Sequence, residues 1–354
     1  MKNIFRKIDM YSKNFRIHWL EYIALFIGID IFTQMLIIPL FRYVTTGILK
    51  ASAIPFVSYQ NIVTIITTHT GVALLLIVEL VILLLVIYGV FALILLGIRE
   101  ISQNQFSLKL LFKELWQTYR SVRVGSILLL GLYFLLIVPF ADMVYRTPLL
   151  AKVQIPEFIL DFMTRNIWLV SGLIIFYLLA FILGIRLILT LPLMIYQEKK
   201  TWIAMKESWK LTSHKNWWTL LSSLLVAGIC VSVILVSCNL IIYFCQLGLD
   251  HLPEKLSFSF AIFNLLLVQT ISELMAIWIS VISLLIVVAP LHGFKDEDQK
   301  KIKSKKTVKI VDLCLVIIFI LTAGINSALY LKGADMQRPV TISHRGVSDK
   351  NGVQ

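Results

Sequence analysis

Seven long runs of apolar residues alternate with short polar gaps along this chain. A helix that crosses a bilayer needs roughly 20 mainly apolar residues. Each run meets that length, and we therefore predict seven transmembrane helices, at Tyr22–Phe41, Val72–Ile98, Val124–Val144, Ile167–Tyr196, Trp218–Leu247, Phe258–Leu291 and Val308–Leu331. The composition agrees with an all-α integral membrane protein, since 58% of the residues are hydrophobic and only 15% are charged.

The lysines and arginines indicate how these spans are oriented. Their number in successive gaps alternates between high and low: five before the first span, then two, five, three, five, one and six. Short cytoplasmic loops carry the excess of Lys and Arg in membrane proteins. We therefore expect a multi-pass protein of the cell membrane with a cytoplasmic N-terminus and an external C-terminus. The same distribution accounts for the net charge of +13 without a nucleic-acid partner.

Short motifs recur at intervals of about 90 residues. Leu96–Arg99 and Leu183–Arg186 both read Leu-Gly-Ile-Arg, 87 residues apart. Lys113–Trp116 and Lys206–Trp209 share Lys-Glu and Trp, 93 residues apart, and each precedes an odd-numbered span. The spacing predicts three repeats of a cytoplasmic amphipathic helix followed by a two-span hairpin, with a seventh span after them.

The predicted amphipathic helices carry apolar residues at helical spacing beside basic residues. Such helices can lie in the headgroup plane of a membrane, and we expect membrane lipids as their partners. Anchoring of the bundle, specific lipid sensing and docking of a partner all fit the pattern. The apolar positions are Ile4, Ile8, Tyr11, Phe15 and Trp19 before the first span, Leu108, Leu111, Phe112, Leu115, Tyr119 and Val122 before the third, and Trp202, Met205 and Trp209 before the fifth.

Four ionisable residues fall inside predicted spans and are candidates for a functional site: Asp30, Glu79, Arg186 and Glu273. A charge at that depth is costly unless it is paired, or faces water or a ligand. We expect Arg186 to pair with one of the three acids inside the bundle. A lipid-headgroup or substrate site and a proton or ion path remain open as alternatives.

The composition changes abruptly after Leu331, where a polar tail begins. Within it, Ile342-Ser343-His344-Arg345-Gly346 resembles the opening strand of the glycerophosphodiester phosphodiesterase catalytic domain, which is a β/α barrel. The hydrophobic region before it resembles the membrane domain that precedes that catalytic domain in some bacterial enzymes. The resemblance implies that His344 is a general acid/base and that Arg345 contacts the substrate phosphate.

Two features depart from that family. A metal-binding glutamate usually follows His-Arg-Gly closely, and Gln354 lies near its position without a carboxylate. A β/α barrel needs about 250 residues, so residues 332–354 can supply only an external linker and the first strand of an incomplete catalytic domain. Residues 1–331 then form the membrane domain. We expect a longer enzyme to use a divalent cation, Ca²⁺ or Mg²⁺, and this chain alone to bind none.

The resemblance implies the membrane-anchoring domain of an outward-facing phosphodiesterase. The full enzyme would hydrolyse glycerophosphodiesters, or a polyglycerol-phosphate polymer, to release glycerol 3-phosphate and an alcohol. By itself, this chain is expected to be inactive. The alternative is a stand-alone multi-pass protein that transports lipid or a small solute, or serves as a scaffold. The three hairpins and the intramembrane charges are compatible with that alternative.

Overall fold

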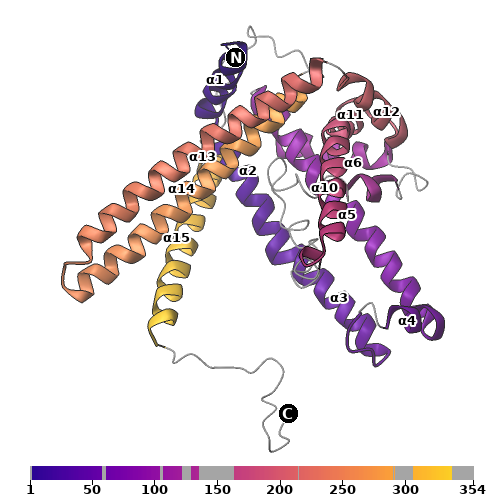
Figure 1. Ribbon diagram of the computed structural model, residues 1–354, viewed down its shortest axis with the longest axis horizontal. Helices are drawn as coiled ribbons and strands as arrows, with labels where there is room; N and C mark the ends of the chain where they lie inside the picture. Colours follow the sequence, from indigo (N-terminus) through magenta and orange to yellow (C-terminus); the bar gives the residue numbers. More distant parts are fainter. Residues whose placement is uncertain are drawn as a thin grey trace, which may run out of the picture. The chain divides into compact units, whose positions relative to one another are not determined.

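The computed structural model describes residues 2–57, 61–103, 107–121, 129–134, 163–213, 215–289, 291 and 306–336. Every regular element within them is a helix (Figure 1). The chain divides into two compact units. Unit 1 comprises Met1–Ile234 and Glu273–Val316, and unit 2 comprises Leu235–Ser272 and Ile317–Gln354. An all-helical protein is therefore confirmed for the described part of the chain, whereas the tail after Met336, with the expected first barrel strand, lies outside it.

Six helical segments within the described residues are long and apolar enough to cross a membrane. They are Trp19–Ala51, Thr70–Ser102, Ile167–Gln197, Asn216–Leu249, Lys255–Val288 and Leu313–Leu331. These match six of the seven predicted spans. The predicted third span, Val124–Val144, lies outside the described residues except for the helical stretch 129–134.

The first span is built from three consecutive segments: α2 (Trp19–Phe32), the π-helical η1 (Thr33–Ile37) and α3 (Ile38–Ala51). Pro39 is the physical reason for the change of winding. Proline has no N–H to donate, and its ring crowds the carbonyl four residues earlier, here that of Met35. The helix accommodates this crowding by one wider turn. The polypeptide then turns back through α4 (Ile62–Thr68) into the second span.

Helix α5 (Thr70–Ser102) is the second span and the centre of unit 1. It packs against α2, α3, α4, α6 (Leu108–Ser121) and α11 (Thr190–Gln197). Its second half, from Ile87 to Ile101, is almost entirely buried. At Gly97 an added Cβ would lie only 2.7 Å from a methyl carbon of Leu25. The absence of a side chain there lets α2 and α5 approach closely.

The three predicted amphipathic helices are present, as α1 (Lys2–Ile17), α6 and α12 (Thr201–Leu211). Helix α1 buries Ile8, Tyr11 and Phe15, three of its predicted apolar positions, against the protein. Helix α12 differs, because it buries the small residues Thr201, Ala204 and Ser208 against α10 (Ile167–Leu187) and α11. Its apolar residues Trp202 and Trp209 are exposed, so this helix packs on the protein through its small residues, and the predicted membrane-facing stripe stays a prediction.

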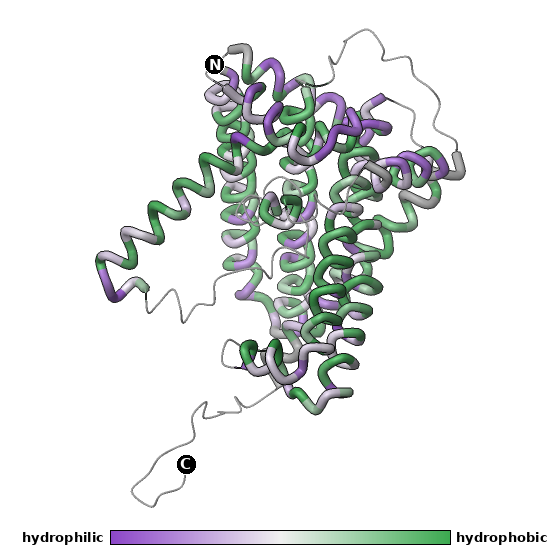
Figure 2. The backbone as a smooth tube through the Cα atoms, turned by 90° about the vertical axis from the view of Figure 1, so that its right-hand side faces the viewer, coloured by the Kyte–Doolittle hydropathy of each residue, from purple (hydrophilic) through white to green (hydrophobic). Residues whose placement is uncertain are grey.

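The exposed tryptophans mark the two ends of the spans in unit 1. Five of them lie at the starts of the first and fifth spans or on the amphipathic helices, namely Trp19, Trp116, Trp202, Trp209 and Trp218. Trp168 is exposed at the opposite end, in the first turn of α10. Tryptophan favours the boundary between hydrocarbon and water. Figure 2 shows hydrophobic positions along the middles of the long helices and hydrophilic ones gathered where the N-terminus lies.

Unit 2 contains the ends of α13 (Lys215–Leu249) and α15 (Lys306–Met336) and the first half of α14 (Glu254–Val288). The hairpin between α13 and α14 is held by the Asn264 amide, which donates to Gln246 Oε1 at 2.6 Å. The Ser327 hydroxyl of α15 donates to Gln269 Oε1 of α14 at 3.2 Å. These amide and hydroxyl contacts satisfy polar groups that would be costly to leave bare in hydrocarbon.

Candidate functional site

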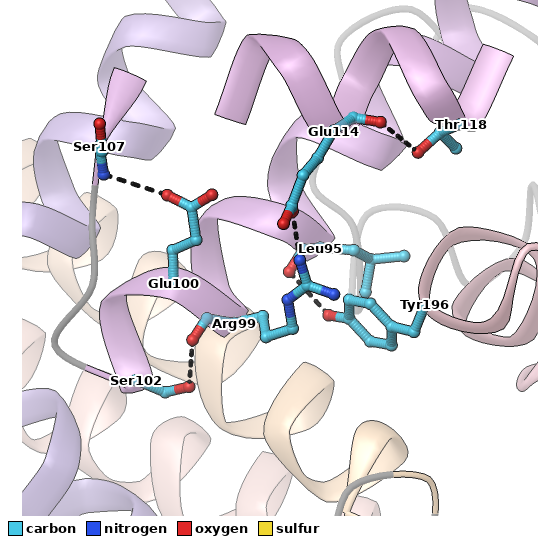
Figure 3. A network of polar contacts seen from close by, with 8 residues as sticks. All are labelled: Leu95, Arg99, Glu100, Ser102, Ser107, Glu114, Thr118 and Tyr196. Carbon is cyan, nitrogen blue, oxygen red and sulfur yellow. Dashed lines mark hydrogen bonds and ion pairs between the residues drawn. The ribbon is translucent and has the colours of Figure 1, made fainter. Parts of the chain in front are cut away.

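A network of polar contacts lies where α5 meets the amphipathic helix α6 (Figure 3). Arg99, near the end of α5, forms an ion pair with Glu114 of α6. Its guanidinium carbon also lies 5.2 Å from the ring centroid of Tyr196 on α11, a cation–π distance. The Tyr196 hydroxyl donates to the Leu95 carbonyl of α5 at 2.7 Å. One arginine therefore joins three helices.

Glu100 occupies the next position of α5 and is almost completely buried, with 3% of its surface exposed. One of its oxygens accepts a hydrogen bond from the backbone N–H of Ser107 at 3.1 Å. Ser107 immediately precedes α6, so this bond holds the entry to that helix. No partner for the other carboxylate oxygen is present in the described part of the chain.

Tyr119 fixes the far end of α6 on α5. Its hydroxyl donates to the Leu85 carbonyl at 2.9 Å, and burial raises the pKa of this phenol. A Cβ added at Gly89 would lie 1.9 Å from the same hydroxyl oxygen, so only glycine leaves room for it. Arg99, Ser107 and Tyr119 together dock α6 along its length.

A second junction, between α10 and α12, is built around Arg186. Its guanidinium donates to the Thr212 carbonyl and lies 4.5 Å from the ring centroid of Trp209. The backbone carbonyl of Arg186 accepts from the Ser208 hydroxyl at 2.8 Å and from the Thr212 hydroxyl at 3.0 Å. Residue 186 thus ties α10 to α12 through both its side chain and its backbone.

The expected ion pair between Arg186 and an intramembrane acid is wrong. Helix α10 ends at Leu187, so Arg186 lies near a helix end and α12 folds back within its reach. A backbone carbonyl and an aromatic face satisfy the guanidinium there. Glu79 instead accepts from the Thr45 hydroxyl at 2.6 Å, and Asp30 and Glu273 are both half-buried on α2 and α14.

The two junctions contain the motifs that recur in the sequence. Arg99 and Arg186 end matching Leu-Gly-Ile-Arg segments, and each contacts the amphipathic helix that follows. They differ in the acid, because Glu207, the counterpart of Glu114, pairs with Lys199 and not with Arg186. This similar placement supports the prediction of internal repeats, which stays a prediction.

The candidate catalytic residues His344 and Arg345 lie outside the described residues, as does Gln354. Within the described residues, no group of three or more His, Cys, Asp or Glu side chains could hold a metal ion. The candidate site with defined geometry is thus a pair of docking junctions, and its contacts hold helices together without any catalytic constellation.

The contacts at these junctions do not show which protein family the chain belongs to, but a comparison with known families does. A family model described as the membrane domain of glycerophosphoryl diester phosphodiesterase matches residues 8–327. The chain belongs to this family. The match begins within α1 and ends within α15, and it includes both junctions, which therefore belong to the membrane domain. It ends before His344. Neither a curated protein nor a solved structure matches the chain.

Proposed function

We propose that this chain is the membrane-anchoring domain of an outward-facing glycerophosphodiester phosphodiesterase. The observation that carries the proposal is the family match over residues 8–327, followed after 16 residues by His344-Arg345-Gly346. A membrane domain of this family and a segment that resembles the first catalytic strand thus occur in the expected order. This order supports the anchoring role, because α15 is the last span before the tail.

The catalytic part would act on a phosphodiester outside the cell. In this proposal His344 transfers a proton during hydrolysis and Arg345 holds the phosphate of the substrate. A divalent cation, Ca²⁺ or Mg²⁺, would neutralise charge on the phosphate and requires carboxylates beyond those tail residues. Phospholipid-derived glycerophosphodiesters and polyglycerol-phosphate are the substrates that fit an external active site. Glycerol 3-phosphate and an alcohol would be the products.

The external location depends on the orientation of the spans. Basic residues gather on α1, α6 and α12 and in the gaps beside them, which supports a cytoplasmic position for this end of unit 1. An odd number of spans would then deliver the tail to the other side. The six described spans and the predicted third one together give seven.

Cysteine labelling tests this orientation. Cys230, Cys238, Cys245 and Cys314 are first replaced by alanine, and single cysteines are then introduced as Asn3→Cys or Ser348→Cys. We expect an impermeant maleimide to label position 348 in intact cells and position 3 only after lysis. Labelling of position 348 only after lysis would overturn the outward-facing arrangement.

A further inference from the structure

A cleft of about 320 Å³ opens in unit 1 among the ends of helices from four different parts of the chain. It lies beside the Arg186 junction, since Thr212 belongs to both. Its walls come from α1, the link after α10, the end of α12, the first turns of α13 and the end of α14. Its lining includes Lys7, Tyr11, Asn216, Thr219, Leu220 and Ile286.

The polar half of this cleft is suited to an anion. Lys7 is its one charged lining residue, and no carboxylate contributes to the described lining. Lys7 is exposed and forms no ion pair within the described residues. Tyr11 contributes a phenol to the lining, and burial raises the pKa of this phenol. Asn216 and Thr219 add amide and hydroxyl groups from the first turns of α13, where the helix dipole also favours negative charge.

The other half of the cleft is apolar. Leu189, Leu220 and Ile286 line it, and all three are buried. A free inorganic anion would not make favourable contacts with these apolar side chains. A phospholipid would meet both halves, with its phosphate at the polar side and the start of an acyl chain along the apolar side.

The position of the cleft agrees with a lipid headgroup. Exposed Trp19 and Trp218 begin the two spans that follow α1 and α12, and tryptophan marks the headgroup level. Helix α1, which carries Lys7, holds four further basic residues and a single acidic one. A basic helix at this level attracts anionic lipids. We propose that this cleft binds the phosphate headgroup of an anionic phospholipid, with Lys7 as the charged contact.

This inference concerns the membrane domain alone and stands independently of the phosphodiesterase proposal. The test measures the thermal unfolding midpoint of the purified 354-residue chain in a non-ionic detergent. Dioctanoyl-phosphatidylglycerol is titrated as the anionic lipid, dioctanoyl-phosphatidylcholine as the zwitterionic control and inorganic phosphate as the free anion. A ligand that binds the folded state raises the midpoint with concentration.

Three variants make the test specific. Lys7→Gln should raise the half-saturating concentration of phosphatidylglycerol by about fivefold, the effect of one lysine near a charged membrane surface. Thr219→Trp should fill the cleft and abolish the stabilisation. Both side chains are exposed, so we expect both variants to fold. Lys13→Gln removes the same charge from α1 outside the cleft lining, and should leave the titration unchanged.

The expected pattern is stabilisation by phosphatidylglycerol alone, weakened by Lys7→Gln and lost in Thr219→Trp. Equal weakening by Lys7→Gln and Lys13→Gln would show general attraction to a basic helix and overturn the site. Inorganic phosphate acting at the same concentration as the lipid would overturn the lipid as ligand. An unchanged midpoint with all three compounds would overturn binding altogether.

Discussion

The contact between Gly89 and Tyr119 gives the sharpest prediction about how α6 is held on α5. In Gly89→Ala, the new Cβ would lie 1.9 Å from the Tyr119 hydroxyl oxygen. An ordinary contact begins at 3.4 Å, so the hydroxyl must retreat by about 1.5 Å. It then loses its 2.9 Å hydrogen bond to the Leu85 carbonyl.

The magnitude follows from two losses. A lost hydrogen bond costs about 0.5–1.5 kcal/mol, and overpacking costs about 1–3 kcal/mol. We expect Gly89→Ala to lower the free energy of unfolding by about 1.5–4.5 kcal/mol relative to Gly28→Ala. Gly28 is the matched control, because it also lies in a span and nothing comes within 4 Å of its added Cβ. Alanine has a higher helix propensity than glycine at both positions, so this gain cancels when the two variants are compared.

A double-mutant cycle assigns the cost to the hydroxyl. In a Tyr119→Phe background the nearest atom to the new Cβ is the ring carbon at 3.0 Å, which needs to move by only a few tenths of an ångström. Gly89→Ala should then cost about 1 kcal/mol. Reversible unfolding in mixed micelles measures the free energies, and hydrogen exchange of α6 amides reports its release. The reasoning is refuted if Gly89→Ala costs the same in both backgrounds, or no more than Gly28→Ala.

Three further predictions follow from the junctions and the amphipathic helices. Arg186→Leu should lower the thermal unfolding midpoint and expose α12 to protease. Adding Glu79→Gln should not change the size of this effect. If the two substitutions are not additive, Arg186 and Glu79 interact after all, as the sequence analysis predicted. Arg99→Met and Glu114→Gln should each destabilise the α5–α6 junction. A double-mutant cycle should give a coupling energy of about 1 kcal/mol between the two side chains. If the free-energy changes of the two substitutions simply add, the ion pair is contradicted. A peptide of residues Ser107–Arg123 should become helical on anionic vesicles. Its basic residues Lys109, Lys113, Arg120 and Arg123 each contribute about 1 kcal/mol of attraction to the anionic surface. A circular dichroism spectrum that stays coil-like with such vesicles would argue against surface binding.

The sequence predicted the spans well because their signal is local. A run of about 20 apolar residues has few alternatives to a membrane helix, and six predicted spans match described helices within a few residues, apart from longer ends such as Trp19–Ala51. The π-helical turn at Thr33–Ile37 was not predicted, although Pro39 is a visible signal for an irregular winding there.

The partners of charged residues were harder to predict, because they depend on how distant helices fold back. Arg186 binds a carbonyl 26 residues away and an aromatic ring, neither of which carries a charge that a sequence search for ion pairs would find. The pairing of Arg99 with Glu114 left a clearer signal, since both lie in recurring motifs and have opposite charges. The motifs were recognised, but their contact was not predicted.

The sequence predicted the amphipathic helices but left open which of their residues pack against the rest of the protein. Helix α1 buries its apolar stripe, as in a soluble protein. Helix α12 buries Thr201, Ala204 and Ser208 and exposes its tryptophans. At a membrane boundary, small residues allow close helix packing and large aromatic residues favour the headgroup layer. Hydrophobicity alone therefore did not identify the packed face.

Hydrolysis by a chain that carries a complete catalytic domain tests the central claim most directly. Two proteins are purified: the 354-residue chain and a version continued through a full β/α barrel. Release of glycerol 3-phosphate from glycerophosphodiesters is measured with added Ca²⁺ or Mg²⁺. We expect turnover only by the longer protein, abolished by His344→Ala, because the resemblance to the catalytic domain implies a second proton-transfer group and metal-binding carboxylates outside residues 332–354. Turnover by the 354-residue chain that is lost on His344→Ala, or inactivity of the longer protein toward every diester tried, would contradict the account.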